Sequence, residues 1–390
     1  MSPARARVGV SLMFFTNGVL LAGLLPRFPE VKDAYGLSAT AFGILVIAMP
    51  LGAMVAAATA GPFIRRFGAR SITAIGSVLL AIAIAAAPHS PVAWGFAAIF
   101  FLAGAIDAIV DAAQNVQGVI VEQWAGKSII NFFHAIWSLG ATTGGLVGTW
   151  CASQGIPLTT QLAANGAVWA VVAIVAAVLA ATPHDNEHEA EQAPEAHSVE
   201  EVATAGPRPW RLLVPLIALA ICGTLMEEVA NSWSALFIDR ETAAPDGLAG
   251  LGFTIVLAAQ FVGRLVGDPM TDRWGREAVA RAGGLLAAAG MALAWVGPSW
   301  HLVLVGFGLM GFGCATLVPA AFAAAARVPG LAHGTGVAVL GWGMRLGFLL
   351  TSPVIGVISD TAGLRHALLV PLAAGLVAAW MAGRLRGATT

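Results

Sequence analysis

The sequence has very little charge for its length. Asp, Glu, Lys and Arg make up only 11% of its 390 residues, whereas a soluble globular protein carries about 25%. Hydrophobic residues make up 58%, and the mean hydropathy is +0.82. A chain with so few polar side chains cannot cover a folded surface in water, which excludes an ordinary soluble domain.

Basic clusters and cysteine motifs are also scarce. The formal net charge is -1, and no basic block could neutralise phosphates, so we expect no nucleic-acid partner. Cys151, Cys222 and Cys314 stand alone in apolar runs, which predicts small core residues rather than ligands. No nucleotide-binding glycine loop is present. We therefore expect neither a metal nor a cofactor, and no coupling to nucleotide hydrolysis.

Long apolar runs fill the chain instead. About 20 apolar residues cross a bilayer as a helix, and twelve such runs occur, as six, a break and six. The sequence therefore predicts an all-α integral membrane protein with twelve transmembrane helices. These runs cover residues 8–25, 40–62, 71–88, 93–119, 128–151, 162–182, 211–236, 248–270, 278–297, 301–326, 334–358 and 365–383.

The break between the two sets is rich in Asp, Glu and Pro, a composition that cannot pack a core. It predicts an N-terminal six-helix bundle at 1–183, an acidic linker at 184–209 and a C-terminal six-helix bundle at 210–390. His184, His188 and His197 in the linker could bind a metal, but their irregular spacing favours a solvated loop.

Lys and Arg are concentrated on one side of the predicted spans, and this side is cytoplasmic by the positive-inside rule. We therefore expect a multi-pass, monomeric protein of the bacterial cytoplasmic (inner) membrane, with both termini and the linker in the cytoplasm. That side contains Arg5, Arg7, Arg65, Arg66, Arg70, Lys127, Arg208, Arg211, Arg273, Arg276, Arg281, Arg327, Arg384 and Arg386. The other side contains only Arg27, Lys32, Arg240 and Arg365.

The two halves contain an internal repeat. The loop after the second run ends Arg65-Arg66-Phe67-Gly68, and the loop after the eighth run ends Asp272-Arg273-Trp274-Gly275-Arg276. Matching their glycines gives an offset of 207 residues (275 − 68), which also pairs Gly104 with Gly311 and Gly140 with Gly347. A duplicated six-helix unit accounts for this agreement across three pairs of helices.

These two loops resemble the G-x-x-x-D-R-x-G-R loop of the major facilitator superfamily. The first copy has Arg65 at the acidic position, and the second has Asp268 in place of the leading glycine. The resemblance implies two pseudo-symmetric six-helix bundles, and helices one, four, seven and ten lining a transport path. We expect Asp272, with Arg273 and Arg276, to latch the loops during gating rather than to contact the solute. The predicted gating-loop residues are Arg65, Arg66, Gly68, Arg264, Asp268, Asp272, Arg273 and Gly275. Among them, Arg264 and Asp268, four apart, are expected to form a structural ion pair.

A narrower resemblance comes from Gly104-Ala-Ile-Asp107-Ala-Ile-Val-Asp111-Ala-Ala-Gln114-Asn115-Val-Gln117-Gly118 and Phe133-His134-Ala-Ile-Trp137-Ser138-Leu139-Gly140. Both segments are similar to the MosC-like and fucose-permease-like branches of this superfamily. These branches contain sugar and inositol-amine transporters. In the fucose-permease-like family an acid on the fourth helix is thought to carry the proton, which the resemblance places on Asp107 first and Asp111 second.

Acidic residues inside apolar runs are costly and require an explanation. Asp107, Asp111 and Asn115 recur every four residues, so they share one helix face that must avoid lipid. They could form structural bonds between helices, but their counterparts at the offset of 207 are Cys314, Val318 and Phe322. The fold therefore does not require acids there. Because burial penalises the charged form of a carboxyl, either Asp can exchange a proton.

The seventh run contains Glu227, Glu228 and Asn231. Glu227 and Asn231 share a face, whereas Glu228 points about 100° away, so we favour Glu227 as cavity-facing and as a proton-coupling residue beside Asp107 and Asp111. Arg345, in the eleventh run, lies too deep to reach either surface. As a hypothesis, it pairs with Glu227, Glu228 or Asp111 in one state and exchanges that partner when substrate or proton binds.

Three further polar residues have two open interpretations. His134 could titrate near neutral pH or pack as a hydrogen-bonded residue. Asn17 and Gln260 could bind a hydroxylated solute or join helices. The predicted substrate site comprises Asn17, Asp107, Asp111, Asn115, His134, Glu227, Glu228, Asn231, Gln260 and Arg345.

The sequence as a whole predicts a secondary active transporter that moves a small polar solute (sugar, polyol or amino-polyol) by alternating access, with protons as the coupling ion. Acids facing a cavity would also suit a proton-driven multidrug or organic-cation exporter, which is the alternative. We do not expect an enzyme, because His134 has no Ser or Cys companion at helical spacing. We do not expect a receptor, because no soluble output module is present.

Overall fold

The structure is a computed structural model that describes residues 2–126, 129–182, 207–325, 328, 335–383 and 385, without the side chains of 131, 207–209, 268, 335, 337 and 338. The described residues group into two compact units. Unit 1 comprises those within Met1–Gly36, Leu45–Ala196 and Asp246–Gly250. Unit 2 comprises those within Leu37–Ile44, His197–Pro245 and Leu251–Thr390.

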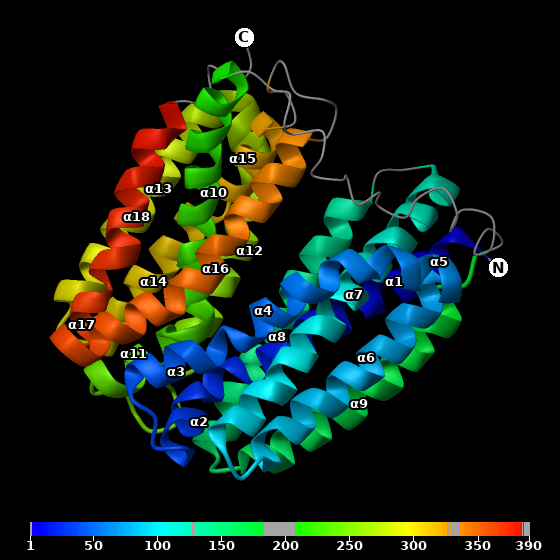
Figure 1. The fold of residues 1–390 in the computed structure, drawn as a ribbon, viewed down its shortest axis with the longest axis horizontal. Coiled ribbons are helices and arrows are strands. Elements are labelled where there is room, and N and C mark those ends of the chain that lie inside the picture. Colours follow the sequence, from blue (N-terminus) through cyan, green and yellow to red (C-terminus); the bar gives the residue numbers. More distant parts are fainter. Residues whose placement is uncertain are drawn as a thin grey trace. The chain divides into compact units, whose positions relative to one another are not determined.

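Unit 1 is built entirely from helices in its described part, and its long helices lie side by side in Figure 1. Helix α1 packs against α8 and α9, and α7 packs against α4 and α6. In order, the elements are α1 (Pro3–Ala22), η1 (Leu25–Arg27), α2 (Phe28–Ala34), α4 (Ala48–Ala56), η2 (Ala57–Thr59), α5 (Ala60–Phe67), α6 (Ala69–Ala86), η3 (Ala87–His89), α7 (Ala93–Ala125), α8 (Ile130–Ser153) and α9 (Leu158–Leu179). Helix α3 (Ala39–Val46) lies mostly in the segment that groups with unit 2.

Unit 2 repeats this arrangement. Helix α10 packs against α16 and α18, and α14 packs against α12 and α13. Its elements are α10 (Pro207–Ser232), α11 (Ser234–Glu241), α12 (Leu251–Trp274), α13 (Arg276–Val296), α14 (Trp300–Cys314), α15 (Leu317–Ala325), α16 (Thr335–Ala362), α17 (Leu364–Ala367) and α18 (Leu369–Met381). The predicted linker lies outside the described residues up to 206, and α10 begins at Pro207, where proline suits the first turn.

Each of the twelve predicted apolar runs is mainly helical in its described part, which confirms the all-α prediction. Ten stretches of the described chain are long and apolar enough to cross a membrane, and Leu251–Gly267 in α12 is a shorter apolar helix. Many apolar side chains remain exposed on the isolated chain, for example Trp94 at 76% and Trp380 at 67%. Lipid would cover such a surface.

Several predicted spans are interrupted rather than continuous, and proline explains most of the breaks. Proline lacks an N–H and its ring clashes with the carbonyl four residues earlier. Accordingly, α3 ends at Val46, four residues before Pro50, and α17 ends at Ala367, four residues before Pro371. Helix α14 ends at Cys314, five residues before Pro319. These breaks lie within the stretches Ala39–Phe67, Trp300–Ala325 and Leu364–Met381, each of which is long and apolar enough to cross a membrane, as predicted.

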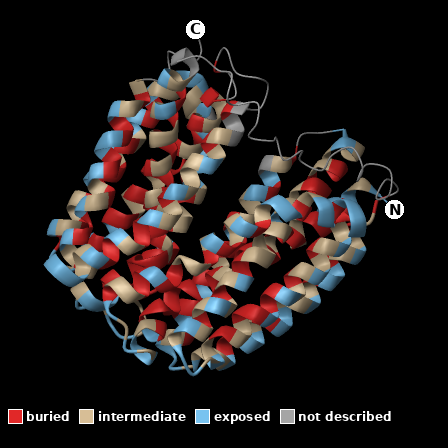
Figure 2. Ribbon diagram, in the orientation of Figure 1, coloured by how far each residue is buried: buried red, intermediate tan, exposed pale blue. Residues whose placement is uncertain are grey.

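In each unit the buried residues lie mainly on helix faces turned towards neighbouring helices and the exposed residues on outward faces (Figure 2), and most of the buried residues are apolar. In unit 1, the rings of Phe14 and Phe133 stack with centroids 5.5 Å apart and join α1 to α8. The three cysteines are buried, as expected for small core residues.

The sequence repeat is also a repeat of contacts. A methyl group added at Gly104 would lie 2.0 Å from the carbonyl oxygen of Met49, and one added at Gly311 would lie 2.5 Å from that of Val256. Because Met49 and Val256 are themselves 207 residues apart, the crossings α4·α7 and α12·α14 correspond. Gly68 and Gly275 likewise both have positive φ, 83° and 81°, at the start of the next helix.

We expect Gly311→Ala to lower the free energy of unfolding by about 1–3 kcal/mol, because overpacking a tight contact with main-chain atoms costs this much. The matched control is Gly308→Ala on the same helix, where an added methyl group would lie 3.6 Å from the nearest atom, in Ile255. Melting temperatures of the purified proteins in detergent measure the difference. Equal melting temperatures for the two variants would show that the crossing is not this tight.

Candidate functional site

The polar residues of unit 1 are centred on α7. Asp107 lies near the middle of this 33-residue helix and is half-buried. Its Oδ1 accepts a hydrogen bond of 2.7 Å from the Nδ2 of Asn17 on α1. The Oδ1 of Asn17 accepts a bond of 2.7 Å from the indole Nε1 of Trp137 on α8. One buried amide thus joins three helices, and it orients its donor group towards the carboxylate.

Asp111 lies one turn further along α7 and is exposed. Its Oδ1 accepts bonds from the Nε2 of Gln114 at 3.1 Å and the Nδ2 of Asn115 at 3.3 Å. His134 on α8 interacts with it electrostatically, and the His134 ring also lies edge-on to Phe14, with centroids 5.3 Å apart. Within unit 1 the structure therefore brings together five residues of the predicted site: Asn17, Asp107, Asp111, Asn115 and His134.

Gln114 is a residue that the sequence interpretation did not select. It is fully buried, and its Oε1 has no hydrogen-bond partner among the described residues. An unsatisfied buried carbonyl is unusual and costs about 1–3 kcal/mol. Its only sequence signal was its position between Asp111 and Asn115.

In unit 2, Glu227 and Glu228 point into different surroundings, as their helical positions require. The Oε1 of Glu227 accepts a bond of 2.8 Å from the Nε2 of Gln260 on α12 and forms an ion pair of 2.9 Å with Arg264. Gln260 also donates to the Sγ of Cys314, at 3.5 Å. Gln260 thus contacts Glu227 and joins α10, α12 and α14.

Glu228 instead is 5% exposed and surrounded by hydroxyl groups. Its Oε1 accepts hydrogen bonds of 2.6 Å from Ser232 on α10 and from Ser352 on α16. Sequence reasoning missed Ser352 because nothing in its local sequence distinguishes it from other small residues of apolar helices.

Arg345 does not form the predicted ion pairs within unit 2. Its guanidinium lies over the ring of Trp342, 5.3 Å from the centroid, and no described carboxylate of this unit lies within ion-pair distance of it. Glu227 is paired with Arg264 instead. Asn231 is half-buried, and no described residue forms a hydrogen bond with its side chain.

The two repeated loops adopt matching structures. Arg66 lies over the Phe67 ring at 5.4 Å, and Arg273 lies over the Trp274 ring at 5.8 Å. Arg65 and Asp272 are exposed. The side chain of Asp268 lies outside the described residues, so its pairing with Arg264 stays a prediction. The gating role of these loops also stays a prediction.

Arg27, a buried arginine in the turn after α1 in unit 1, entered the sequence analysis only as a loop charge in the positive-inside comparison. Arg27 is 2% exposed. It forms an ion pair with Glu30 and donates to the Oε1 of Gln161 at 2.6 Å and the carbonyl of Ile156 at 2.8 Å. Gln161 in turn donates to the carbonyl of Gly23 at 2.7 Å. This cluster fixes the turn after α1 against α9.

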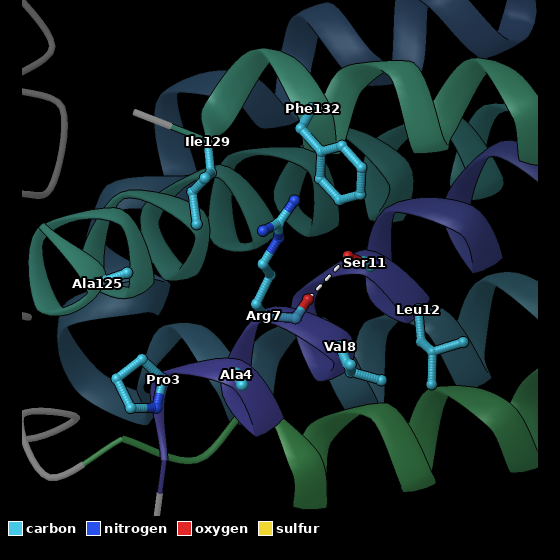
Figure 3. A pocket seen from close by; sticks show the side chains of 9 residues that line it. All are labelled: Pro3, Ala4, Arg7, Val8, Ser11, Leu12, Ala125, Ile129 and Phe132. Carbon is cyan, nitrogen blue, oxygen red and sulfur yellow. Dashed lines mark hydrogen bonds between the residues drawn. The ribbon is translucent and has the colours of Figure 1, made fainter. Parts of the chain in front are cut away.

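A cavity of about 530 Å³ lies at the start of α1 in unit 1. Figure 3 shows its largely apolar lining and the Arg7 side chain extending towards Phe132, whose ring lies 4.4 Å from the guanidinium. No residue of the predicted substrate site lines it. Among the described residues, no group of three or more His, Cys, Asp or Glu side chains could hold a metal ion.

Comparison with known proteins decides the family. The chain matches the sequence pattern of the Major Facilitator Superfamily over residues 10–241 and 216–389. The chain belongs to the major facilitator superfamily. It is a multi-pass membrane transporter of this superfamily, as the two repeated loops predicted.

Curated relatives cover nearly the whole chain. The membrane protein MosC of Rhizobium meliloti is 30% identical over 380 residues, which are 95% of this chain and 88% of MosC. An uncharacterized transporter of Sinorhizobium fredii is 30% identical over 380 residues, 95% of this chain and 96% of the relative. These matches confirm the predicted resemblance to MosC.

Solved structures share the fold at low sequence identity. The nucleoside transporter NupG has a TM-score of 0.72 at 16% identity, and the match covers 99% of both chains. The xylose transporter XylE from E. coli has a TM-score of 0.71 at 14% identity, covering 97% of this chain and 96% of XylE. The fucose transporter FucP has a TM-score of 0.63 at 19% identity, covering 97% of both chains.

Proposed function

We propose that this superfamily member is a secondary active transporter that moves a small polar solute across the bacterial cytoplasmic membrane by alternating access, with protons as the coupling ion. The proposed solute is a sugar, polyol or amino-polyol. The protein would act as a monomer with both termini in the cytoplasm. Two structural neighbours, a fucose:proton symporter and a xylose transporter, support this class of substrate and this coupling ion.

One observation carries the proposal most directly. Helix α7 holds Asp107 and Asp111 on one face, and Asp107 is bound to an amide that is itself held by Trp137. A carboxylate with fixed donors and acceptors around it can bind a hydroxylated solute and also exchange a proton. Its counterpart in the duplicated helix is Cys314, so the polar set is not a requirement of the scaffold.

The substrate is best sought by melting the purified protein in detergent with a panel of sugars, polyols, amino-polyols and organic cations. A ligand present at 100 times its Kd stabilises the native state by about 2.7 kcal/mol. We expect a polyhydroxylated compound to raise the melting temperature. If only organic cations do so, the export alternative is favoured and the proposed substrate class is wrong.

The compound found in this way is then tested for uptake into proteoliposomes. We expect accumulation above the external concentration when the interior is alkaline, and none after a protonophore has collapsed the gradient. Equal accumulation with and without the gradient would contradict proton coupling.

A further inference from the structure

Glu228 is a buried carboxyl that the unit 1 site does not use. It lies on α10 with 5% exposure, and both hydroxyl bonds go to its Oε1, from Ser232 and from Ser352, at 2.6 Å each. The other carboxyl oxygen, Oε2, accepts no hydrogen bond from a described residue. The group therefore has one oxygen held by donors and one oxygen available for a proton.

The donor at Ser352 is itself oriented. Ser352 is fully buried, and its Oγ accepts a bond of 3.0 Å from the indole Nε1 of Trp233, which is 1% exposed. An indole nitrogen can only donate, so it fixes the Ser352 hydroxyl as a donor towards Glu228. This chain of hydrogen bonds runs in one direction and ends on the carboxyl.

No cation among the described residues forms an ion pair with this carboxyl. On α10, Glu227 is paired with Arg264 of α12. On α16, Arg345 lies seven residues before Ser352, about 10 Å along the axis, and stacks on Trp342. No described ionisable group on the helices packed against α10 forms an ion pair with Glu228. The other described ionisable groups on α10 and on these helices are Arg211, Cys222, Glu227, Asp239, Arg240, Glu241, Arg264, Asp272, Arg273, His301, Cys314, Arg345 and Asp360; α15 and α18 contain none.

Scaffold packing does not explain Glu228. At the repeat offset of 207, its counterpart on α1 is Leu21, and the counterpart of Ser352 on α8 is Gly145. The corresponding helix pair α1·α8 therefore packs without a carboxyl or a hydroxyl at these positions. An uncompensated charge buried away from water costs several kcal/mol, and binding a proton removes that charge.

We propose that Glu228 is a proton-binding site of unit 2, distinct from Asp107 and Asp111 in unit 1, with Ser232 and Ser352 as positioning residues. An O–H bond forms between Oε2 and a proton delivered by hydronium, which leaves as water; release reverses this step. The inference deepens the proposed function, on which its role in transport rests. It assigns to Glu228 the proton-coupling role that the sequence analysis favoured for Glu227.

The test is infrared difference spectroscopy of the full chain reconstituted in lipid, recorded as the pH is raised in sodium-free buffer. A protonated carboxyl gives a carbonyl stretch that disappears on ionisation. We expect one such band in the wild type to be missing in Glu228→Gln. The control is Glu241→Gln, which should keep the band, because Glu241 forms an ion pair with Arg365 and is not the proposed proton site. Ser352→Ala should shift that band to higher frequency, since it removes a hydrogen bond to the carbonyl. This variant replaces Glu228→Gln in the test if Glu228→Gln does not fold.

Two outcomes would overturn the proposal: an unchanged spectrum in Glu228→Gln, or a band that sodium ions remove at constant pH. The measurement also separates this inference from the proposed function. In Asp107→Asn/Asp111→Asn protein the Glu228 band should persist. If it persists there and the wild-type protein accumulates no compound with the pH gradient, the proton site stands and proton-coupled transport fails.

Discussion

Asp107→Asn is expected to abolish accumulation of substrate driven by a pH gradient, reducing it to the level of empty liposomes. The substitution removes the ionisable group and keeps an oxygen at the position where Asn17 donates its 2.7 Å hydrogen bond. The bond from Trp137 to Asn17 is also kept. Helix packing should therefore survive, while the proton that the carboxyl would exchange has no place to bind.

The measurement compares uptake and exchange of the compound identified in the melting screen, in proteoliposomes with an alkaline interior and with no gradient. Exchange without a gradient should remain, because it requires substrate binding but no net proton transfer. Asp246→Asn, at an exposed loop position, is the matched control and should transport like the wild type. Gradient-driven accumulation by Asp107→Asn at wild-type levels would remove Asp107 from the mechanism.

Arg27→Met is expected to lower the free energy of unfolding by about 2–4 kcal/mol, because the Oε1 of Gln161 and the carbonyl of Ile156 lose their donor, and an unsatisfied buried acceptor costs about 1–3 kcal/mol. Arg27 is 2% exposed, and Glu30, Gln161 and the carbonyl of Ile156 would all lose their donor. The melting temperature in detergent should fall more than for any other single change considered above.

Arg281→Met is the matched control for this prediction. Arg281 also forms an ion pair, with Glu277, but its side chain is 52% exposed. Exposed pairs spaced four residues apart in a helix contribute about 0.3–0.5 kcal/mol, so this variant should melt close to the wild type. Similar losses in both variants would mean that burial of Arg27 adds nothing to its contribution.

Sequence reasoning recovered the features that depend on local pattern. Period and length predicted the helices, and the four-residue spacing of Asp107, Asp111 and Asn115 placed them on one face, where Asn115 does bond Asp111. The glycine offset predicted equivalent helix crossings, which the contacts of Gly104 and Gly311 confirm. Each of these inferences uses information within one helix or a comparison of two.

The partners of the site residues could not be predicted in the same way. Trp137 lies 120 residues from Asn17, and Ser352 lies 124 residues from Glu228. A helix position fixes the direction of a side chain but not the neighbour that it meets. For this reason the sequence separated Glu227 from Glu228 by angle and then favoured Glu227, although Arg264 neutralises Glu227 and no described cation reaches Glu228.

The crossings at Gly104 and Gly311 are made against carbonyl oxygens of Met49 and Val256. Every amino acid supplies that oxygen, so the residue opposite the glycine can change during evolution without loss of the contact. A scaffold joined in this way tolerates substitution, and its two copies can acquire different side chains at equivalent positions, such as Asp107 in one and Cys314 in the other.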